Sequence, residues 1–161
     1  MLAIAFFCEL QIEELWVSFG TGNHYRMIAE HSIARQLGPR KVAALPFFHS
    51  FTGCDTTSAF AGRGEKTCWD VWRVYPDVTE AFLMLSDSPH LVSQEAAALI
   101  EKFVVYIYSK TLEVSEVNEA RQILFSKENR SLENIPPTQA ALFEYICRAG
   151  YQAGHVLGKG C

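Results

Sequence analysis

The sequence predicts a mostly α-helical chain with one or two β-strands that belongs to a larger α/β fold. One segment, Glu14–Phe19, has the composition of a strand, being rich in β-branched and aromatic residues. About seven later segments have helical spacing, and a lone strand among them cannot form a sheet. The chain also opens on an apolar run, Met1–Phe7, which lacks the basic flank and cleavage site of a signal peptide. We therefore expect the remaining strands to come from residues not present here or from another chain.

Glycine and proline divide the first half of the chain into elements. In order, we predict a turn at Gly20–Asn23, helices at Ile28–Leu37, 40–51, Lys66–Val74 and Thr79–Leu85, and a loop over residues 52–64. Gly38 caps the first helix and Pro39 begins the second. Pro46 either starts a separate helix or kinks the one it lies in, and Asp77 is the expected N-cap of the fourth helix.

The second half is predicted to be helical apart from one polar linker. Helices are expected from Gln94 to about Lys110, over Glu116–Lys127, and from Thr138 to about Leu157, with the linker at Asn129–Pro137 between the last two. Ser93 is a candidate N-cap, and Thr138 caps the final helix.

Composition narrows the class of protein. The chain has no run of eighteen apolar residues, so we expect no membrane partner. Its five cysteines are scattered and form no CxxC pair, which favours a reducing compartment over a disulfide framework or a zinc site. We expect an intracellular protein whose cysteines are small buried side chains.

Charge is distributed unevenly along the chain. Residues 26–73 carry seven Lys and Arg against four acids, although the whole chain has a net charge of −4. A basic island of this kind is compatible with phosphate contacts. The alternative is ordinary scatter over a solvated surface, and charge alone favours that alternative.

The segment Leu45–Trp72 carries the chemistry. An apolar helix runs into Gly53-Cys54-Asp55, and a glycine-rich turn, Gly62-Arg63-Gly64-Glu65-Lys66-Thr67, then opens a new helix. Glycines at a helix start let a ligand approach the backbone, whose free N–H groups attract anions. A side chain at Gly64 is expected to block that approach and to disturb the dihedral angles of the turn. Asp55 is either a metal ligand or a residue that caps its own loop.

This helix–GxD–loop–GxGxK–helix segment resembles the flap-endonuclease and 5′-nuclease superfamily, whose core is PIN-like. The resemblance implies that Asp55 is a catalytic carboxylate binding Mg²⁺ or Mn²⁺. It also implies a helix-turn-helix clamp on duplex DNA, made by Gly62, Arg63, Gly64, Lys66 and Thr67. Residues 1–88 would then be the C-terminal portion of a PIN-like nuclease domain, and residues 89–161 a helical extension.

The whole chain also resembles a widespread group of animal proteins that look transposon-associated. They share the patterns ELWVxFG, ALPxFHxxTGCDTxSxFxGxGxKTxWDxW and NIPPTxAALxxxxxRAxYQAG. In longer members a segment with paired aspartates precedes the region where this chain starts. The resemblance therefore implies a nuclear protein whose intact form hydrolyses phosphodiester bonds, and a chain that is inactive alone because two-metal hydrolysis needs several carboxylates. The alternative is a non-catalytic module that binds nucleic acid or protein.

Several residues have both a functional and a structural interpretation. Glu65 precedes Lys66 where a nucleotide-binding P-loop needs glycine, which argues against triphosphate binding. His49 is expected to be a hydrogen-bonded core residue rather than a base for Cys54. Trp69 and Trp72 are expected to pack in the core rather than stack on bases. Apolar surface is expected to be exposed where the missing sheet belongs, around Ala3–Phe7 and Leu15–Phe19, and through it the chain is expected to associate with itself or with a partner.

Overall fold

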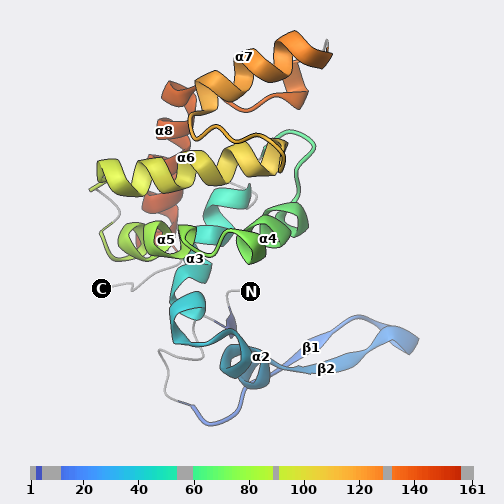
Figure 1. The fold of residues 1–161 in the computed structure, drawn as a ribbon. Coiled ribbons are helices and arrows are strands. Elements are labelled where there is room, and N and C mark those ends of the chain that lie inside the picture. The colour runs from blue at the N-terminus through green and yellow to red at the C-terminus, as the bar shows by residue number, and fades with distance from the viewer. Residues whose placement is uncertain (1–2, 5–11, 54–59, 89–90, 129–131, 157–161) are drawn as a thin grey trace.

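The computed structural model describes residues 3–4, 12–53, 60–88, 91–128 and 132–156. Within these ranges the chain forms seven α-helices and one β-hairpin (Figure 1). In order, the elements are β1 (Trp16–Phe19), η1 (Gly22–His24), β2 (Arg26–Ala29), α2 (Glu30–Leu37), α3 (Pro39–Gly53), α4 (Glu65–Val74), α5 (Val78–Asp87), α6 (Gln94–Tyr108), α7 (Val117–Glu128), η2 (Leu132–Asn134), α8 (Gln139–Tyr151) and η3 (Gln152–Val156). The prediction of a mostly helical chain with one or two strands is confirmed.

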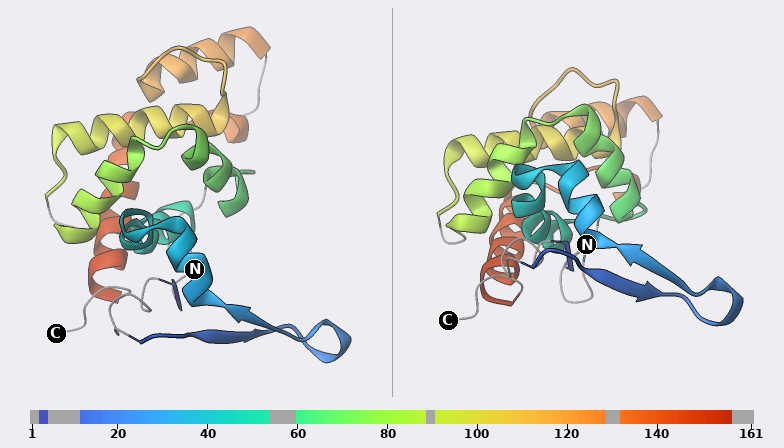
Figure 2. Two further views of the ribbon diagram at one scale, coloured as in Figure 1. Left: turned by 60° about the horizontal axis from the view of Figure 1, so that its bottom comes forward. Right: turned by 90° about the horizontal axis from the view of Figure 1, so that it is seen from below.

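The two strands form an antiparallel hairpin that projects from the helices (Figures 1 and 2). Trp16 pairs with Ala29 at the base of the hairpin, and Phe19 pairs with Arg26 near its tip. The predicted helix Ile28–Leu37 is therefore wrong in its first two residues, which belong to β2. Their pairing with Trp16 and Val17 shows why: a partner strand supplies backbone hydrogen bonds at positions whose side-chain spacing also suits a helix.

Most helix boundaries follow the predicted capping residues. Gly38 ends α2 with φ +78°, and Pro39 begins α3. The side chains of Ser93 and Thr138 accept hydrogen bonds from the N–H groups of Ala96 and Ala141, at 3.1 and 3.2 Å. Asp77 is the N-cap residue of α5, as predicted, although its side chain makes no cap hydrogen bond.

Helix α3 runs through Pro46 without ending. Proline supplies no N–H for the helix ladder, and the Ser50 hydroxyl donates to the Pro46 carbonyl at 2.9 Å one turn later. Pro46 therefore lies inside a single helix and does not begin a second one.

The core is built on aromatic side chains around α3. Phe47, Phe48 and Phe51 are almost fully buried and contact Phe82 of α5. Trp72 of α4 is also buried, and its indole N–H donates to the Thr79 hydroxyl at 2.8 Å. α3 thus packs against α5, α8, α2 and α4. The division predicted at residue 88 stays a prediction, although buried side chains on both sides of it belong to one hydrophobic cluster.

A buried carboxylate joins the three C-terminal helices. Glu101 of α6 is 9% exposed, and its Oε1 accepts the N–H of Val117, the first residue of α7, at 2.9 Å. The side-chain amide of Gln139, the first residue of α8, lies 3.4 Å from both Glu101 oxygens. Glu101 therefore holds the starts of two helices in place.

In the described parts of the chain, every helix is too short or too polar to cross a lipid bilayer.

Candidate nucleic-acid interface

The glycine-rich turn is a β-turn followed directly by the start of α4. The Arg63 N–H donates to the Phe60 carbonyl at 2.9 Å, which closes the turn. Gly62 occupies the third position with φ +66°, the left-handed region that type II turns require there. The predicted sites Gly62, Arg63, Gly64, Lys66 and Thr67 are thus held within one short structural unit.

The two glycines of this turn have different roles. Gly64 is the N-cap of α4 with φ −74° and ψ 169°, an extended conformation open to any residue. The expectation that a side chain at Gly64 disturbs the dihedral angles is therefore wrong, because the unusual angle belongs to Gly62. A Cβ at either position would meet nothing within 4 Å. Both glycines therefore leave the backbone accessible to a ligand.

The start of α4 carries one exposed cation. The side chain of Lys66 is 88% exposed, and its ammonium lies 2.8 Å from the carboxylate of Asp70 one turn later. This hydrogen bond lowers the pKa of Asp70. The Thr67 N–H is already bonded to the Gly64 carbonyl at 2.9 Å.

Arg63 turns from the helix start toward α6. Its guanidinium lies 5.4 Å from the ring centroid of Tyr108. Its Nε is buried, and within the described residues it has no hydrogen-bond partner. The structure therefore separates Arg63 from Lys66, although the two are three residues apart in the chain.

The acid in the first turn of α4 faces α3. Glu65 Oε1 lies 2.9 Å from His49 Nδ1, which links the end of α3 to the start of α4. His49 is hydrogen-bonded, as predicted, but it is half-buried and not a core residue. Cys68 of α4 is fully buried, as expected of a small apolar side chain. Burial together with the charge of Glu65 raises the pKa of its thiol to about 12.

Asp55, the predicted catalytic and metal-binding residue, lies outside the described residues, in the segment 54–59 between α3 and the turn. Across the ranges that are described, no three His, Cys, Asp or Glu side chains come close enough to hold a metal ion. The metal therefore stays a prediction.

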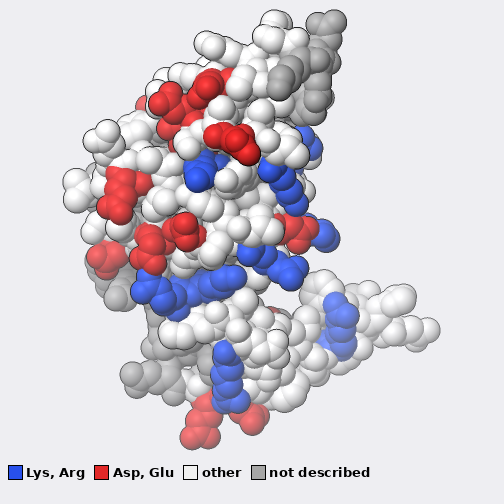
Figure 3. Space-filling model, in the orientation of Figure 1, with Lys and Arg blue, Asp and Glu red and all other residues white. Residues whose placement is uncertain are grey.

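Basic side chains surround α4 on the face shown in Figure 3. Lys66, Arg73 and Lys110 all lie close enough to Asp70 to lower its pKa. Lys41 of α3 lies over the rings of Trp69 and Trp72 at 5.9 and 5.5 Å, and Lys102 of α6 lies over Tyr75 and Tyr106. We call Lys41, Lys66, Arg73, Lys102 and Lys110 the basic surface.

Two members of the basic surface were missed at the level of sequence. Lys102 and Lys110 belong to the acidic second half of the chain, and they reach α4 because α6 packs against it. Counting charges along the chain does not show which face of α6 packs against α4. The two lysines could therefore not be assigned to this surface from the sequence.

The two tryptophans of α4 pack under Lys41 of the basic surface. Trp72 is fully buried, as predicted, and Trp69 is partly buried against Phe48. The buried Trp72 ring offers no open face for a base. Exposed aromatic residues lie on the hairpin, where Trp16, Phe19 and Tyr25 are each more than half exposed, and also on α7 and α8, at Phe125, Phe143 and Tyr151. Association through this hairpin stays a prediction.

No protein-family model matches this chain, and the searches of curated proteins and of solved structures also gave no match.

Proposed function

We propose that this chain binds the phosphate backbone of DNA through the basic surface and the glycine-rich turn. The observation that carries the proposal is the convergence around α4 of five cations, which come from α3, α4, α6 and the turn just after α6. Lys66, Asp70 and Arg73 share one face of the helix because their spacing is four and three residues. Phosphate contacts of this kind give affinity without reading the base sequence.

The turn adds a second kind of contact. The first N–H groups of α4 lie at the positive end of the helix dipole, and Gly64 leaves open space beside them. Glu65, the acid of that first turn, lies toward His49. A phosphate can therefore approach the helix start between the turn and Lys66.

Two variants of the Lys66–Asp70 ion pair test the proposal, because they should change the affinity for DNA in opposite directions. Lys66→Ala should lower the affinity for labelled duplex DNA and make the salt dependence shallower by roughly 0.9 in log K per log salt. Asp70→Asn should raise the affinity, because it removes the anion that competes with phosphate for Lys66. Arg26→Ala, which removes an exposed cation from the hairpin, is the control for net charge.

A glycine variant tests backbone approach separately. Gly64→Val should weaken DNA binding while costing about 1 kcal/mol or less of folding stability, since its φ suits any residue and its Cβ direction is open. Equal affinity of wild type, Lys66→Ala and Gly64→Val at two salt concentrations would contradict the proposal.

We propose as a second function that the intact protein is a metal-dependent, PIN-like nuclease, which hydrolyses phosphodiester bonds. The resemblance of the segment Gly53–Lys66 to flap endonucleases supports this function. So does the His49–Glu65 contact, which ties together the helices that flank Asp55 in sequence. The chemistry a divalent cation supplies is activation of water and stabilisation of charge on phosphate oxygens. Asp55→Ala should abolish cleavage of branched DNA in Mg²⁺ or Mn²⁺ and leave DNA binding intact; normal cleavage by Asp55→Ala would exclude this role.

A further inference from the structure

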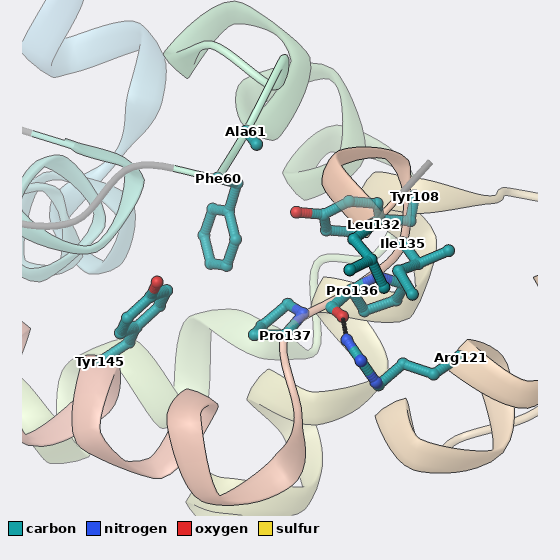
Figure 4. A pocket seen from close by; sticks show the side chains of 9 residues that line it. All are labelled: Phe60, Ala61, Tyr108, Arg121, Leu132, Ile135, Pro136, Pro137 and Tyr145. Carbon is teal, nitrogen blue, oxygen red and sulfur yellow. Dashed lines mark hydrogen bonds between the residues drawn. The ribbon is translucent and has the colours of Figure 1, made fainter. Parts of the chain in front are cut away.

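A cavity of about 170 Å³ lies directly beside the glycine-rich turn (Figure 4). Its walls come from the turn, from the ends of α6 and α7, from the linker before α8 and from α8 itself. The lining residues are Phe60, Ala61, Tyr108, Arg121, Leu132, Ile135, Pro136, Pro137 and Tyr145. Ala61 is exposed and Leu132 is 72% exposed, so these two residues mark the mouth.

Aromatic rings and hydroxyl groups face this cavity together. Phe60 makes edge-to-face contacts with Tyr108 and Tyr145, with centroids 6.4 and 6.1 Å apart. Figure 4 shows the Tyr108 and Tyr145 hydroxyls directed toward Phe60 from opposite sides of its ring. The cavity thus offers ring faces and edges for an aromatic ligand, and hydroxyls for its polar edge.

The cations beside the cavity favour an electron-rich ligand. Arg63 lies over Tyr108, and Arg121 donates a hydrogen bond to the Pro136 carbonyl at the wall. Burial raises the pKa of Tyr108, so its hydroxyl stays protonated at neutral pH and is able to donate. A ligand with ring carbonyl oxygens would accept from such a donor.

Size and position identify the ligand class. A cavity of roughly 150 Å³ accepts a benzene ring, so this volume suits one pyrimidine-sized ring. Phe60 and Ala61 begin the β-turn that leads into Gly64 and Lys66, so cavity and phosphate contacts are parts of one loop. We propose that the cavity takes a single unpaired nucleobase of the nucleic acid whose backbone lies on the basic surface. This inference rests on the function proposed above.

The consequence is a preference for DNA that already presents an unpaired base. A paired base must leave its stack before it enters a pocket, and that step is least costly at bulges, mismatches and single-stranded ends. Contacts between bases and aromatic side chains then add affinity that intact duplex does not obtain.

The test compares three labelled DNAs: an intact duplex, the same duplex with one bulged thymine, and the same duplex with a bulged abasic residue. The two bulged molecules carry equal charge and similar bends, so they differ in the base alone. We expect the bulged thymine to bind about fivefold or more tightly than the abasic bulge.

Two variants test whether the preference for the bulged thymine arises at the cavity. Ala61→Phe sets a ring at the exposed mouth and should abolish the preference for thymine. Tyr145→Phe keeps the ring and should reduce the preference by removing one hydroxyl. Ala98→Phe, at an exposed position of α6, is the matched control and should retain it.

Each outcome separates this inference from the function on which it rests. Equal binding of thymine and abasic bulges by wild type, with duplex binding still sensitive to Lys66→Ala, overturns the cavity proposal alone. A preference unchanged in Ala61→Phe also overturns it. Failure to bind any of the three DNAs overturns both proposals.

Discussion

The helical body and the β-hairpin use similar residues in opposite ways. Phe47, Phe48 and Phe51 of α3 are at most 2% exposed, whereas Trp16, Phe19 and Tyr25 on the hairpin are 51–59% exposed. α3 has helices on several sides, and the hairpin projects away from them (Figure 2). Aromatic composition therefore does not distinguish core from surface in this chain; the number of neighbouring elements does.

The largest expected contrast comes from one truncation in each region. Phe48→Ala should destabilise the protein by about 3–5 kcal/mol, because it empties space shared with Trp69, Trp72 and Phe82. Phe19→Ala should change stability by about 0.5 kcal/mol or less, since most of its ring is already in water. Chemical denaturation of both variants measures the difference. Similar losses would mean that the hairpin is covered in solution.

A smaller effect is expected at the polar link within the body. Glu101→Ala leaves the Val117 N–H without its acceptor and should cost about 1–3 kcal/mol. Glu101→Gln keeps a carbonyl oxygen at that place and should recover part of the loss. Thermal unfolding of the two variants provides the measurement, and an equal loss in both would show that the charge of Glu101, rather than its oxygen, matters.

The smallest global effect is expected from a change confined to the hairpin. A Cβ at Gly20, where φ is +87°, would lie 2.3 Å from the His24 carbonyl oxygen, so Gly20→Ala should disrupt the turn. Hydrogen exchange of strand amides should then accelerate while helix amides keep their protection. Gly22→Ala is the control, because its φ is also positive but its Cβ direction is open. Faster exchange throughout the helices would show that hairpin and body unfold together.

Local signals in the sequence were enough to predict most helices. Gly38, Pro39, Ser93 and Thr138 act through their own backbone geometry or their own hydroxyl, and the structure confirms them. β2 was missed because its four residues become a strand through pairing with β1, which is a contact between segments. The association of β1 with β2 is a tertiary effect that outweighs local propensity.

Only those residues of the candidate interface that lie close together in the sequence could be predicted. The turn from Gly62 to Thr67 is one unit in the sequence and in the structure. The other contributors lie much later in the sequence and join the interface through packing that no spacing rule describes: Lys102 and Tyr108 of α6, Lys110 just after α6, and Tyr145 of α8. Arg63 shows the same limit. It is close to the start of α4 in the sequence, but its guanidinium lies over the ring of Tyr108.

The packing of α3 against α8 has a consequence for how the chain folds. These helices are far apart in the sequence, and α8 packs directly against α3, whose phenylalanines lie in the core. At roughly 5–20 residues per second, several seconds of synthesis separate their emergence from the ribosome. The nascent chain therefore carries the phenylalanines of α3 incompletely covered throughout that interval, which is when chaperones would bind it and when aggregation would compete with folding.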